Sequence, residues 1–243
     1  MDAPLSLLIH GASGRMGQAL LRLCAESPER FTVAGAVSRK PQQRVVDGVP
    51  QFAVAELNGV PAFDVAVDFS LPEAFDAVLA LCVARKAGLV SGTTGLHEAQ
   101  RIALEEAARV VPVLWASNFS LGVAVLADAV ARAARALPDW DCDIVETHHA
   151  GKRDAPSGTA LTLGEAVAAG GATPRYASLR AGDIVGEHTV QFSGRGERLE
   201  FIHRATSRDV FAHGALQAAQ WLSGRAPGQY RMADLLQSRP MAG

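Results

Sequence analysis

The 243-residue chain has an ordinary globular composition, with 49 % hydrophobic and 20 % charged residues, and is long enough for one large domain or two modest ones. Its net charge of −2 gives no general attraction for nucleic acid, so we expect no nucleic-acid partner. Three cysteines without a CxxC pair argue against a disulfide framework and favour a cytoplasmic location. The first apolar run, residues 5–9, is too short for a signal peptide or a membrane span, so no membrane partner is expected.

Strand-like and helix-like patterns alternate about five times in the first half of the chain. A continuous apolar run predicts a buried strand at residues 5–9, and further strands are predicted at residues 31–37, 63–69, 88–91 and 110–115. Apolar residues at helical spacing predict helices at residues 15–25, 73–86 and 97–108. This alternation is typical of an α/β fold with a Rossmann-type, doubly wound parallel sheet.

The pattern changes after residue 120. The predicted elements are helices at residues 121–137, 159–169 and 211–223, and strands at residues 143–147, 184–192 and 198–204. A glycine-containing loop is expected at residues 170–174. Successive strands without intervening helices indicate a smaller α+β domain whose sheet is largely antiparallel.

Three glycines, Gly11, Gly14 and Gly17, stand between the first predicted strand and the first predicted helix. In a Rossmann fold this turn places backbone N–H groups and a helix N-terminus against the pyrophosphate of a dinucleotide. We therefore expect dinucleotide binding, with a purely structural turn as the alternative. No Lys-Ser or Lys-Thr pair follows the glycines, which disfavours a nucleoside triphosphate loop.

The end of the second predicted strand indicates which cofactor is preferred. Enzymes that use NAD usually carry an acidic residue there, whereas this chain has Ser38, Arg39 and Lys40. An arginine can bind a 2′-phosphate with two hydrogen bonds, so we predict NADPH as the preferred cofactor, with NADH possible. The alternative is a solvated basic turn before Pro41.

Small and hydroxyl-bearing residues follow the fourth and fifth predicted strands, at residues 92–95 and 116–119. The carboxyl ends of strands are where open α/β sheets bind ligands. Position alone leaves ligand contact and helix capping open for both segments.

A cluster of chemically capable residues follows the strand predicted at residues 143–147. His148 and His149 precede Lys152, which a turn can bring back towards the imidazoles. The following segment, residues 156–159, can cap a helix and offer N–H groups and hydroxyls to a carboxylate. Adjacent histidines have poor spacing for chelation, so no metal is expected. A small dicarboxylate substrate fits this combination, whereas structural histidines and a simple helix cap are the alternatives.

Residues 146–160 read ETHHAGKRDAPSGTA, and this run resembles the signature of the dihydrodipicolinate reductase (4-hydroxy-tetrahydrodipicolinate reductase) family. Further stretches similar to that family lie at residues 11–17, 68–70, 92–95, 117–122 and 180–188. The resemblance implies a dinucleotide-binding domain formed by residues 1–119 and 209–243. It also implies a substrate-binding and oligomerisation domain at residues 120–208, with an open mixed sheet, in a homotetramer. The implied reaction is the NAD(P)H-dependent reduction of 4-hydroxy-tetrahydrodipicolinate to tetrahydrodipicolinate, with loss of water, in diaminopimelate and lysine biosynthesis.

The resemblance also implies roles for single residues. His148 resembles the family's general acid/base and Lys152 its proton donor. The residues that resemble substrate contacts are His149, Ser157, Gly158 and Thr159. The residues that resemble cofactor contacts are Gly11, Ala12, Ser13, Gly14, Arg15, Met16, Ser38, Arg39, Gly92, Thr93, Thr94, Ala116, Ser117, Asn118 and Phe119.

Two other functions compete with this hypothesis. An oxidoreductase of another pathway, such as a homoserine or aspartate dehydrogenase, would keep the Rossmann half without needing residues 152–159. A non-enzymatic NADPH-sensing protein would bind the cofactor and turn nothing over, and the intact His-His-Lys cluster argues against it.

Overall fold

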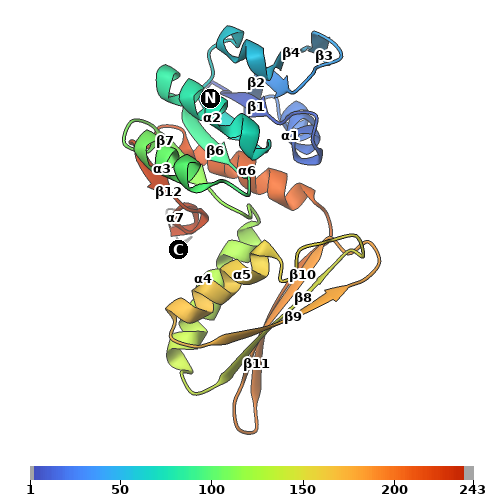
Figure 1. Ribbon diagram of the computed structural model, residues 1–243, viewed down its shortest axis with the longest axis vertical. Helices are drawn as coiled ribbons and strands as arrows, with labels where there is room; N and C mark the ends of the chain where they lie inside the picture. Colours follow the sequence, from blue (N-terminus) through green and yellow to red (C-terminus); the bar gives the residue numbers. More distant parts are fainter. Residues whose placement is uncertain (1–2, 238–243) are drawn as a thin grey trace. The chain divides into compact units, whose positions relative to one another are not determined.

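The computed structural model describes residues 3–237. The chain divides into two compact units, Met1–Phe119 with Phe211–Gly243, and Ser120–Val210 (Figure 1). Among the described residues, no helix has both the length and the apolar character needed to cross a membrane.

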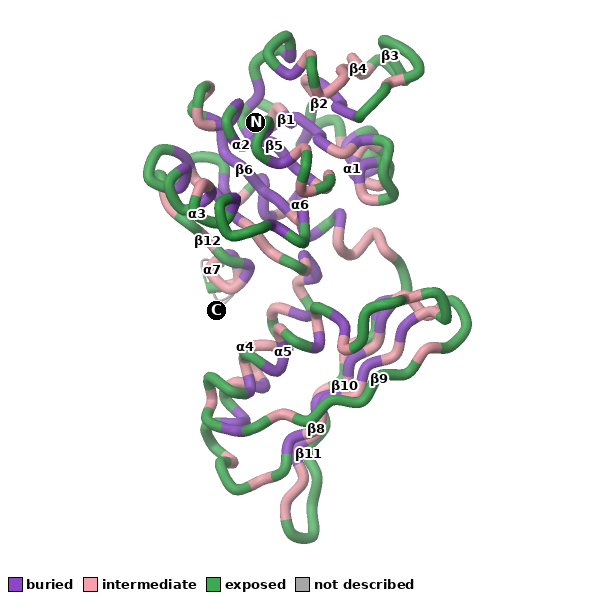
Figure 2. Tube along the Cα trace, in the orientation of Figure 1, coloured by how far each residue is buried: buried purple, intermediate pink, exposed green. Residues whose placement is uncertain are grey.

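The first unit is built on a sheet in the order β12-β7-β6-β5-β1-β2-β4-β3. Its strands are β1 Leu5–His10, β2 Phe31–Ser38, β3 Val45–Val46, β4 Val49–Ala53, β5 Val65–Asp68, β6 Gly88–Ser91, β7 Pro112–Trp115 and β12 Gly228–Tyr230. All neighbouring pairs are parallel except β3 with β4. The central strands are almost wholly buried (Figure 2), as expected for a parallel sheet with both faces covered.

Helices cover this sheet and fix its core. They are α1 Arg15–Glu26, α2 Pro72–Arg85, α3 Glu98–Ala107, α6 Asp209–Leu222 and α7 Met232–Gln237, with the 3₁₀ helix η1 at Val54–Gly59. On one face, Leu8 and Leu89 of the sheet join a buried cluster with Phe75 of α2 and Leu104 of α3. The fully buried Ile9 alternates with Leu8 and therefore faces the other side.

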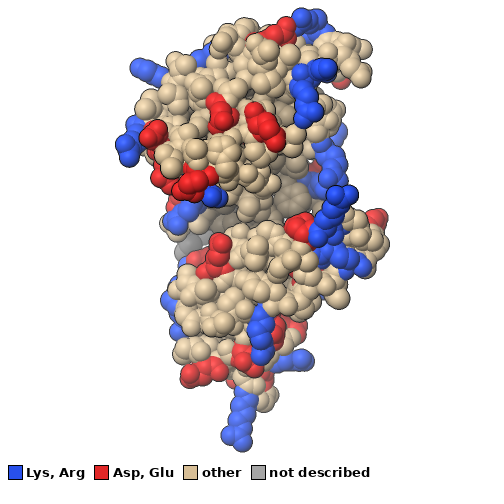
Figure 3. Space-filling view, in the orientation of Figure 1, with Lys and Arg blue, Asp and Glu red and all other residues tan. Residues whose placement is uncertain are grey.

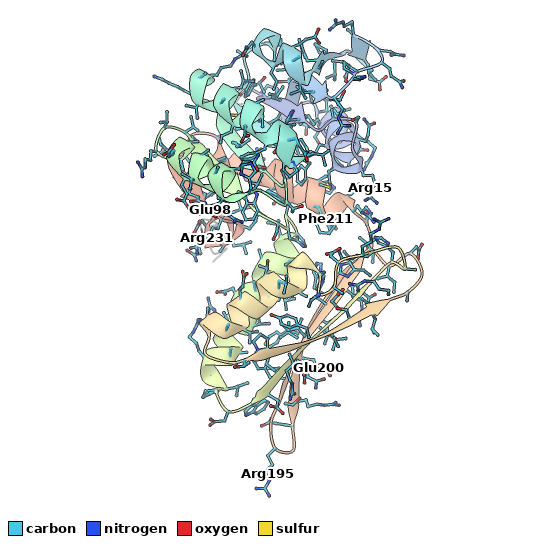
Figure 4. All side chains as sticks on the ribbon, in the orientation of Figure 1. Arg15, Glu98, Arg195, Glu200, Phe211 and Arg231 are labelled. Atoms are coloured by element: carbon cyan, nitrogen blue, oxygen red, sulfur yellow. The ribbon has the colours of Figure 1, made fainter. Side chains whose placement is uncertain are left out.

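The second unit packs two helices on one face of a four-stranded sheet in the order β11-β10-β8-β9. The strands are β8 Asp141–His148, β9 Pro174–Arg180, β10 Gly186–Ser193 and β11 Arg198–Ala205, and the helices are α4 Leu121–Ala136 and α5 Gly158–Ala169. Ile144 and Phe192 of the sheet contact Val130 of α4 and Leu163 of α5 in one buried cluster. Arg195, labelled in Figure 4, lies at the tip of the hairpin between β10 and β11.

The parallel Rossmann-type sheet is confirmed, and so is a largely antiparallel second sheet, in which two of the three strand pairs are antiparallel. The unpredicted strand β9 pairs in parallel with β8, while β10 is antiparallel to both of its neighbours. The sheet is therefore mixed, as the family resemblance implies. Five further elements were not predicted, namely β3, β4, η1, β12 and α7.

Candidate active site

The turn between β1 and α1 is shaped by glycines that no other residue could replace. Gly11 has a φ of +82°, and a Cβ there would lie 2.4 Å from the carbonyl oxygen of Phe69. A Cβ on Gly17 would lie 2.4 Å from the oxygen of Gly11. Helix α1 begins after Gly14 without a side-chain cap, so its N-terminus suits an anion such as a phosphate. Arg15 is exposed at this end of α1 (Figure 4).

A pocket of about 660 Å³ opens beside this turn, within the usual size range of ligand sites. The residues that line it are His10, Gly11, Ser13, Gly14, Val37, Ser38, Arg39, Lys40, Val54, Phe69, Ser70, Leu71, Glu73 and Ala74. Ser38 is buried, whereas Arg39 and Lys40 are exposed. The pocket thus joins the glycine turn to the basic residues after β2, with no acidic residue at the position of Ser38.

The remaining predicted cofactor residues lie outside that pocket. These are Ala12, Arg15, Met16, Gly92, Thr93, Thr94, Ala116, Ser117, Asn118 and Phe119. Phe69 nevertheless connects their loops to the glycine turn. A Cβ on Gly92 would lie 2.2 Å from the Phe69 ring, and the Phe119 ring packs edge-on against it with centroids 5.4 Å apart. The loops that follow β1, β5, β6 and β7 therefore lie together at the carboxyl ends of the parallel strands.

In the second unit, His148 ends strand β8 with its ring buried and its Nδ1 hydrogen-bonded to the carboxylate of Glu146. Glu146 is fully buried and also binds Arg180 through both oxygens, at 2.8 and 3.0 Å. The backbone N–H of Ser157 donates to the same carboxylate at 3.3 Å. One carboxylate thus ties together strands β8 and β9 and the N-terminus of α5.

The protonation states of this group follow from its surroundings. Burial alone raises the pKa of Glu146, but hydrogen bonds from Arg180, Ser178 and His148 outweigh it and hold the pKa at about 2. Burial lowers the pKa of His148, with a smaller lowering from the cations Lys152 and Arg180, and these outweigh the opposite effect of Glu146. At neutral pH the imidazole is therefore neutral. Because an ionised carboxylate can only accept, the imidazole hydrogen is on Nδ1, and Nε2 carries the lone pair.

A second histidine supports the first turn of α5. The rings of His188 and His148 are 5.2 Å apart and edge-on. The hydroxyl of Ser157 caps α5 by accepting from the N–H of Ala160 at 3.2 Å, and it lies 3.2 Å from Nε2 of His188. Burial lowers the pKa of His188 to about 4, so this ring is neutral at neutral pH and shares one hydrogen bond with the serine hydroxyl. The hydroxyl of Ser157 is thus engaged within the protein.

The other predicted residues lie around the open end of this cluster. The ammonium of Lys152 donates to both carboxylate oxygens of Asp154 at 2.8 Å, and its charge acts on the pKa of His148. His149 and Thr159 are half-buried. Gly158 is exposed at the start of α5, and a Cβ there would meet nothing within 4 Å. Among residues 3–237, no three His, Cys, Asp or Glu side chains are grouped in a way that could hold a metal ion.

Sequence reasoning gave no role to Glu146, Arg180 or His188. Glu146 had a usable signal, since residues two apart on a strand face the same side, as Glu146 and His148 do. Arg180 is the direct neighbour of His148 across β8 and β9, and His188 is opposite Glu146 across β8 and β10. These two relationships require the strand register, which the sequence alone does not provide.

Comparison with known proteins shows the family of the chain. The family model for the N-terminus of dihydrodipicolinate reductase matches residues 5–119, and the model for its C-terminus matches residues 122–236. The chain belongs to the dihydrodipicolinate reductase family. Within this family it is 72 % identical over 237 residues to a 4-hydroxy-tetrahydrodipicolinate reductase of Stenotrophomonas maltophilia, covering 97 % of this chain and 99 % of that one. It is 63 % identical over 236 residues to that of Xylella fastidiosa, covering 97 % and 100 %.

Solved structures share the fold at low sequence identity. Dipicolinate-bound dihydrodipicolinate reductase from Paenisporosarcina sp. TG-14 has a TM-score of 0.80 at 21 % identity, covering 94 % of this chain and 97 % of that one. A diaminopimelate dehydrogenase of C. glutamicum has a TM-score of 0.61 at 14 % identity, covering 98 % and 97 %. These likenesses concern the fold alone, and the family assignment rests on the sequence matches.

Proposed function

We propose that this chain reduces 4-hydroxy-tetrahydrodipicolinate to tetrahydrodipicolinate. The balanced reaction consumes one NAD(P)H and one proton and releases NAD(P)⁺ and water, in the diaminopimelate route to lysine. The observation that carries the proposal is the buried Glu146–His148 pair beside Lys152 and the N-terminus of α5, in a member of the dihydrodipicolinate reductase family. It combines proton-handling groups with an anion site, and this reduction requires both.

The first unit is the proposed binding site for the cofactor, which supplies a hydride when bound. Gly11 and Gly17 give the close backbone approach that a pyrophosphate requires, and the pocket beside them supports a dinucleotide. We propose NADPH as the preferred cofactor, because Arg39 and Lys40 line this pocket together with Ser38. An arginine binds a phosphate through two hydrogen bonds, and no carboxylate stands at Ser38 to repel it.

Lys152 and His148 are the proposed proton-handling groups. The ammonium of Lys152 donates a proton to the substrate as negative charge develops on it. Nε2 of His148 accepts a proton, because Glu146 holds the neutral ring with its hydrogen on Nδ1. A Cβ at position 186 would lie 3.0 Å from that nitrogen, so Gly186 leaves space beside it.

The substrate's carboxylates are assigned to the N-terminus of α5 and to His149. The twelve-residue helix begins at Gly158, and its dipole favours an anion at that end. Gly158 is exposed and Thr159 follows it, while Ser157 acts by holding the helix cap in place. The dicarboxylate that the related Paenisporosarcina reductase binds supports this substrate class.

We further propose a homotetramer that assembles through the open face of the second sheet. Helices α4 and α5 cover only one face. On the other, Val145 neighbours Thr189 in β10, and Ile202 follows in β11. Ile202 is 45 % exposed and Leu179 in β9 is 55 % exposed, so a second copy of this chain would bury apolar side chains there. The free, buried cysteines agree with a cytoplasmic location.

The test is turnover with the freshly made product of dihydrodipicolinate synthase. The purified chain should consume NADPH only when that product is present, and tetrahydrodipicolinate should form in equal amount. Aspartate and homoserine with oxidised cofactor test the competing dehydrogenase functions, and turnover of either in place of the synthase product would overturn the proposal. NADPH binding without any turnover would favour the sensing function.

A further inference from the structure

A row of buried polar side chains crosses the first unit just beneath the cofactor pocket. His10, Asp68 and Ser91 end the adjacent strands β1, β5 and β6 and are direct neighbours in the sheet register. Their relative exposures are 1 %, 0 % and 0 %. The residues two positions earlier in each strand, Leu8 for instance, belong to the apolar core. Ion-forming groups at such positions cost stability, so their presence calls for a functional reason.

Asp68 uses both of its carboxylate oxygens to connect separate loops. Oδ1 accepts from Nδ1 of His10 at 2.8 Å and from the backbone N–H of Ser70 at 3.1 Å. Oδ2 accepts from the hydroxyl of Ser91 at 2.8 Å and from that of Thr93 at 2.7 Å. A carboxylate is planar and rigid, so a rotation that improves one pair of bonds disturbs the other.

The carboxylate is ionised. Burial alone would raise the pKa of Asp68, but the hydrogen bond and charge of His10, with the donors Ser70 and Thr93, hold the pKa below its usual value. The hydroxyl of Thr93 thus depends on a charged acceptor, and charge-assisted bonds are the stronger ones. The backbone carbonyl of Thr93 accepts a hydrogen bond from the indole N–H of Trp115 at 2.9 Å, which holds the other side of the same loop.

Only one of the two ring nitrogens of His10 has a hydrogen-bond partner among the described residues. Nδ1 donates to Asp68, whereas the buried Nε2 has no hydrogen-bond partner among the described residues. His10 also lines the pocket beside Gly11, Ser38 and Arg39. It therefore belongs both to the buried network and to the wall of the proposed NADPH site.

We propose that Asp68 is a positioning residue that couples the phosphate-binding turn after β1, through His10, to the loop carrying Thr93, so that the pyrophosphate and the nicotinamide end of the cofactor are held in one frame. The inference rests on the proposed function, because it takes the pocket's ligand to be that cofactor. Removal of either His10 or Thr93 from the network loosens the same carboxylate. Their contributions to NADPH binding are therefore not independent.

A double-mutant cycle tests this coupling with substitutions at the two ends of the network. His10→Leu removes one of the two donors to Oδ1, and Thr93→Val removes one of the two donors to Oδ2 while keeping the shape of the side chain. Each should raise the Kd for NADPH about tenfold, the effect of leaving a buried polar group unsatisfied. The Kd of the double variant should be at most about threefold higher than that of the weaker-binding single variant. If the two sites were independent, the two effects would multiply, and the Kd would rise about a hundredfold above that of the unaltered chain.

Conservative variants separate positioning from general damage to the fold. His10→Asn keeps a donor near the position of Nδ1 and removes Nε2, and Thr93→Ser keeps the hydroxyl. Both should bind NADPH within about threefold of the unaltered chain, because the bonds to Asp68 survive. The unaltered chain and all five variants are compared by NADPH titration and by kcat and KM for each substrate. In His10→Leu, Thr93→Val and the double variant, the KM for NADPH should rise while the KM for the dicarboxylate stays constant.

Three outcomes overturn the inference in different ways. Normal binding and turnover by the unaltered chain, with multiplicative losses in the double variant, would overturn the coupling and leave the proposed function standing. Failure of the unaltered chain to bind NADPH would overturn both together. Loss of binding in His10→Asn as severe as in His10→Leu would also reject the positioning role, since the bond to Asp68 would then not be what matters.

Discussion

Glu146 holds His148 by its Nδ1 hydrogen, and the two residues face the same buried side of strand β8. The carboxylate is in turn held by both terminal nitrogens of Arg180. This arrangement fixes the tautomer and the orientation of the imidazole, and it leaves Nε2 as the nitrogen that can exchange a proton with a substrate. The guanidinium of Arg180 also pairs with the buried negative charge of Glu146, which would be strongly destabilising if it were left unpaired.

Glu146→Gln should lower kcat more than it changes KM for NADPH. The amide can offer its oxygen to either His148 or Arg180, but it removes the charge that both of them pair with. Replacement of a group that orients a reacting histidine costs about 10–100-fold in activity. Steady-state kinetics with varied NADPH and varied dicarboxylate measures the two effects separately.

Glu26→Gln provides the matched control for that substitution. Glu26 pairs with Arg22 on the exposed surface of α1, where an ion pair contributes little. Its activity should be unchanged within about twofold. Equal kinetics for Glu146→Gln and the unaltered chain would show that the carboxylate does not act through His148.

The pH profile should report the neutral form of His148. Its pKa is lowered, chiefly by burial, so the acid limb of kcat/KM should lie below the ordinary histidine value of about 6.5. Activity is then fully present at neutral pH and is lost as the pH falls through the lowered pKa. Since Glu146 raises and Arg180 lowers this pKa, Glu146→Gln should move the limb to lower pH and Arg180→Met to higher pH. Shifts of the same sign in both variants would contradict this account.

Lys152→Ala should abolish most of the turnover while leaving NADPH binding intact. A positioned proton donor contributes about 10²–10⁴-fold to the rate, and Lys152 lies outside the proposed NADPH pocket. Arg153→Ala is the matched control, because it removes an exposed neighbouring cation to which we assign no role. Comparable losses in the two variants would indicate a general effect of positive charge, and the donor role would then be wrong.

The cofactor preference should depend on the residues after β2. Arg39→Ala should raise the KM for NADPH about tenfold and affect NADH little, because a hydrogen-bonded charge pair with the 2′-phosphate is lost. Ser38→Asp should go further and favour NADH, since a carboxylate repels that phosphate and accepts from the ribose hydroxyl. The ratio of kcat/KM for the two cofactors is the measurement. Arg44→Ala, which removes an exposed arginine paired with Glu56, should leave the ratio unchanged.

The first unit could be predicted because its strands and helices alternate along the chain and each one has a recognisable pattern within its own segment. The buried parallel strands are short and mainly apolar, as in β5 and β6, and the glycines after β1 mark the turn proposed to bind the cofactor. The weak edge strands escaped prediction. Strand β12 has only three residues and β3 only two, so neither is long enough to show a strand-like pattern. On the visible face of each unit, acidic and basic side chains occur together (Figure 3), in keeping with the small net charge.

The second unit shows where sequence reasoning stops. Strand β9 is mostly exposed along its length, so no alternation marked it, and its parallel pairing with β8 could not be foreseen. The cluster of His148, His149 and Lys152 was visible as residue types at close spacing. The groups that surround this cluster, Arg180 above all, reach it only through strand register. The sequence pattern therefore indicated the residues that we propose to react, and it gave no role to Glu146 and Arg180, whose hydrogen bonds hold the imidazole of His148 in place.

Transfer of a labelled hydride tests the central claim most directly. The unaltered chain is supplied with NADPH carrying deuterium at the transferable C4 position and with the product of dihydrodipicolinate synthase, and the products are examined by mass spectrometry. We expect tetrahydrodipicolinate that contains a single deuterium, with oxidised cofactor formed in equal amount and little of either in Lys152→Ala. Labelled cofactor consumed without deuterium in tetrahydrodipicolinate, or no consumption by the unaltered chain, would contradict the proposed reduction.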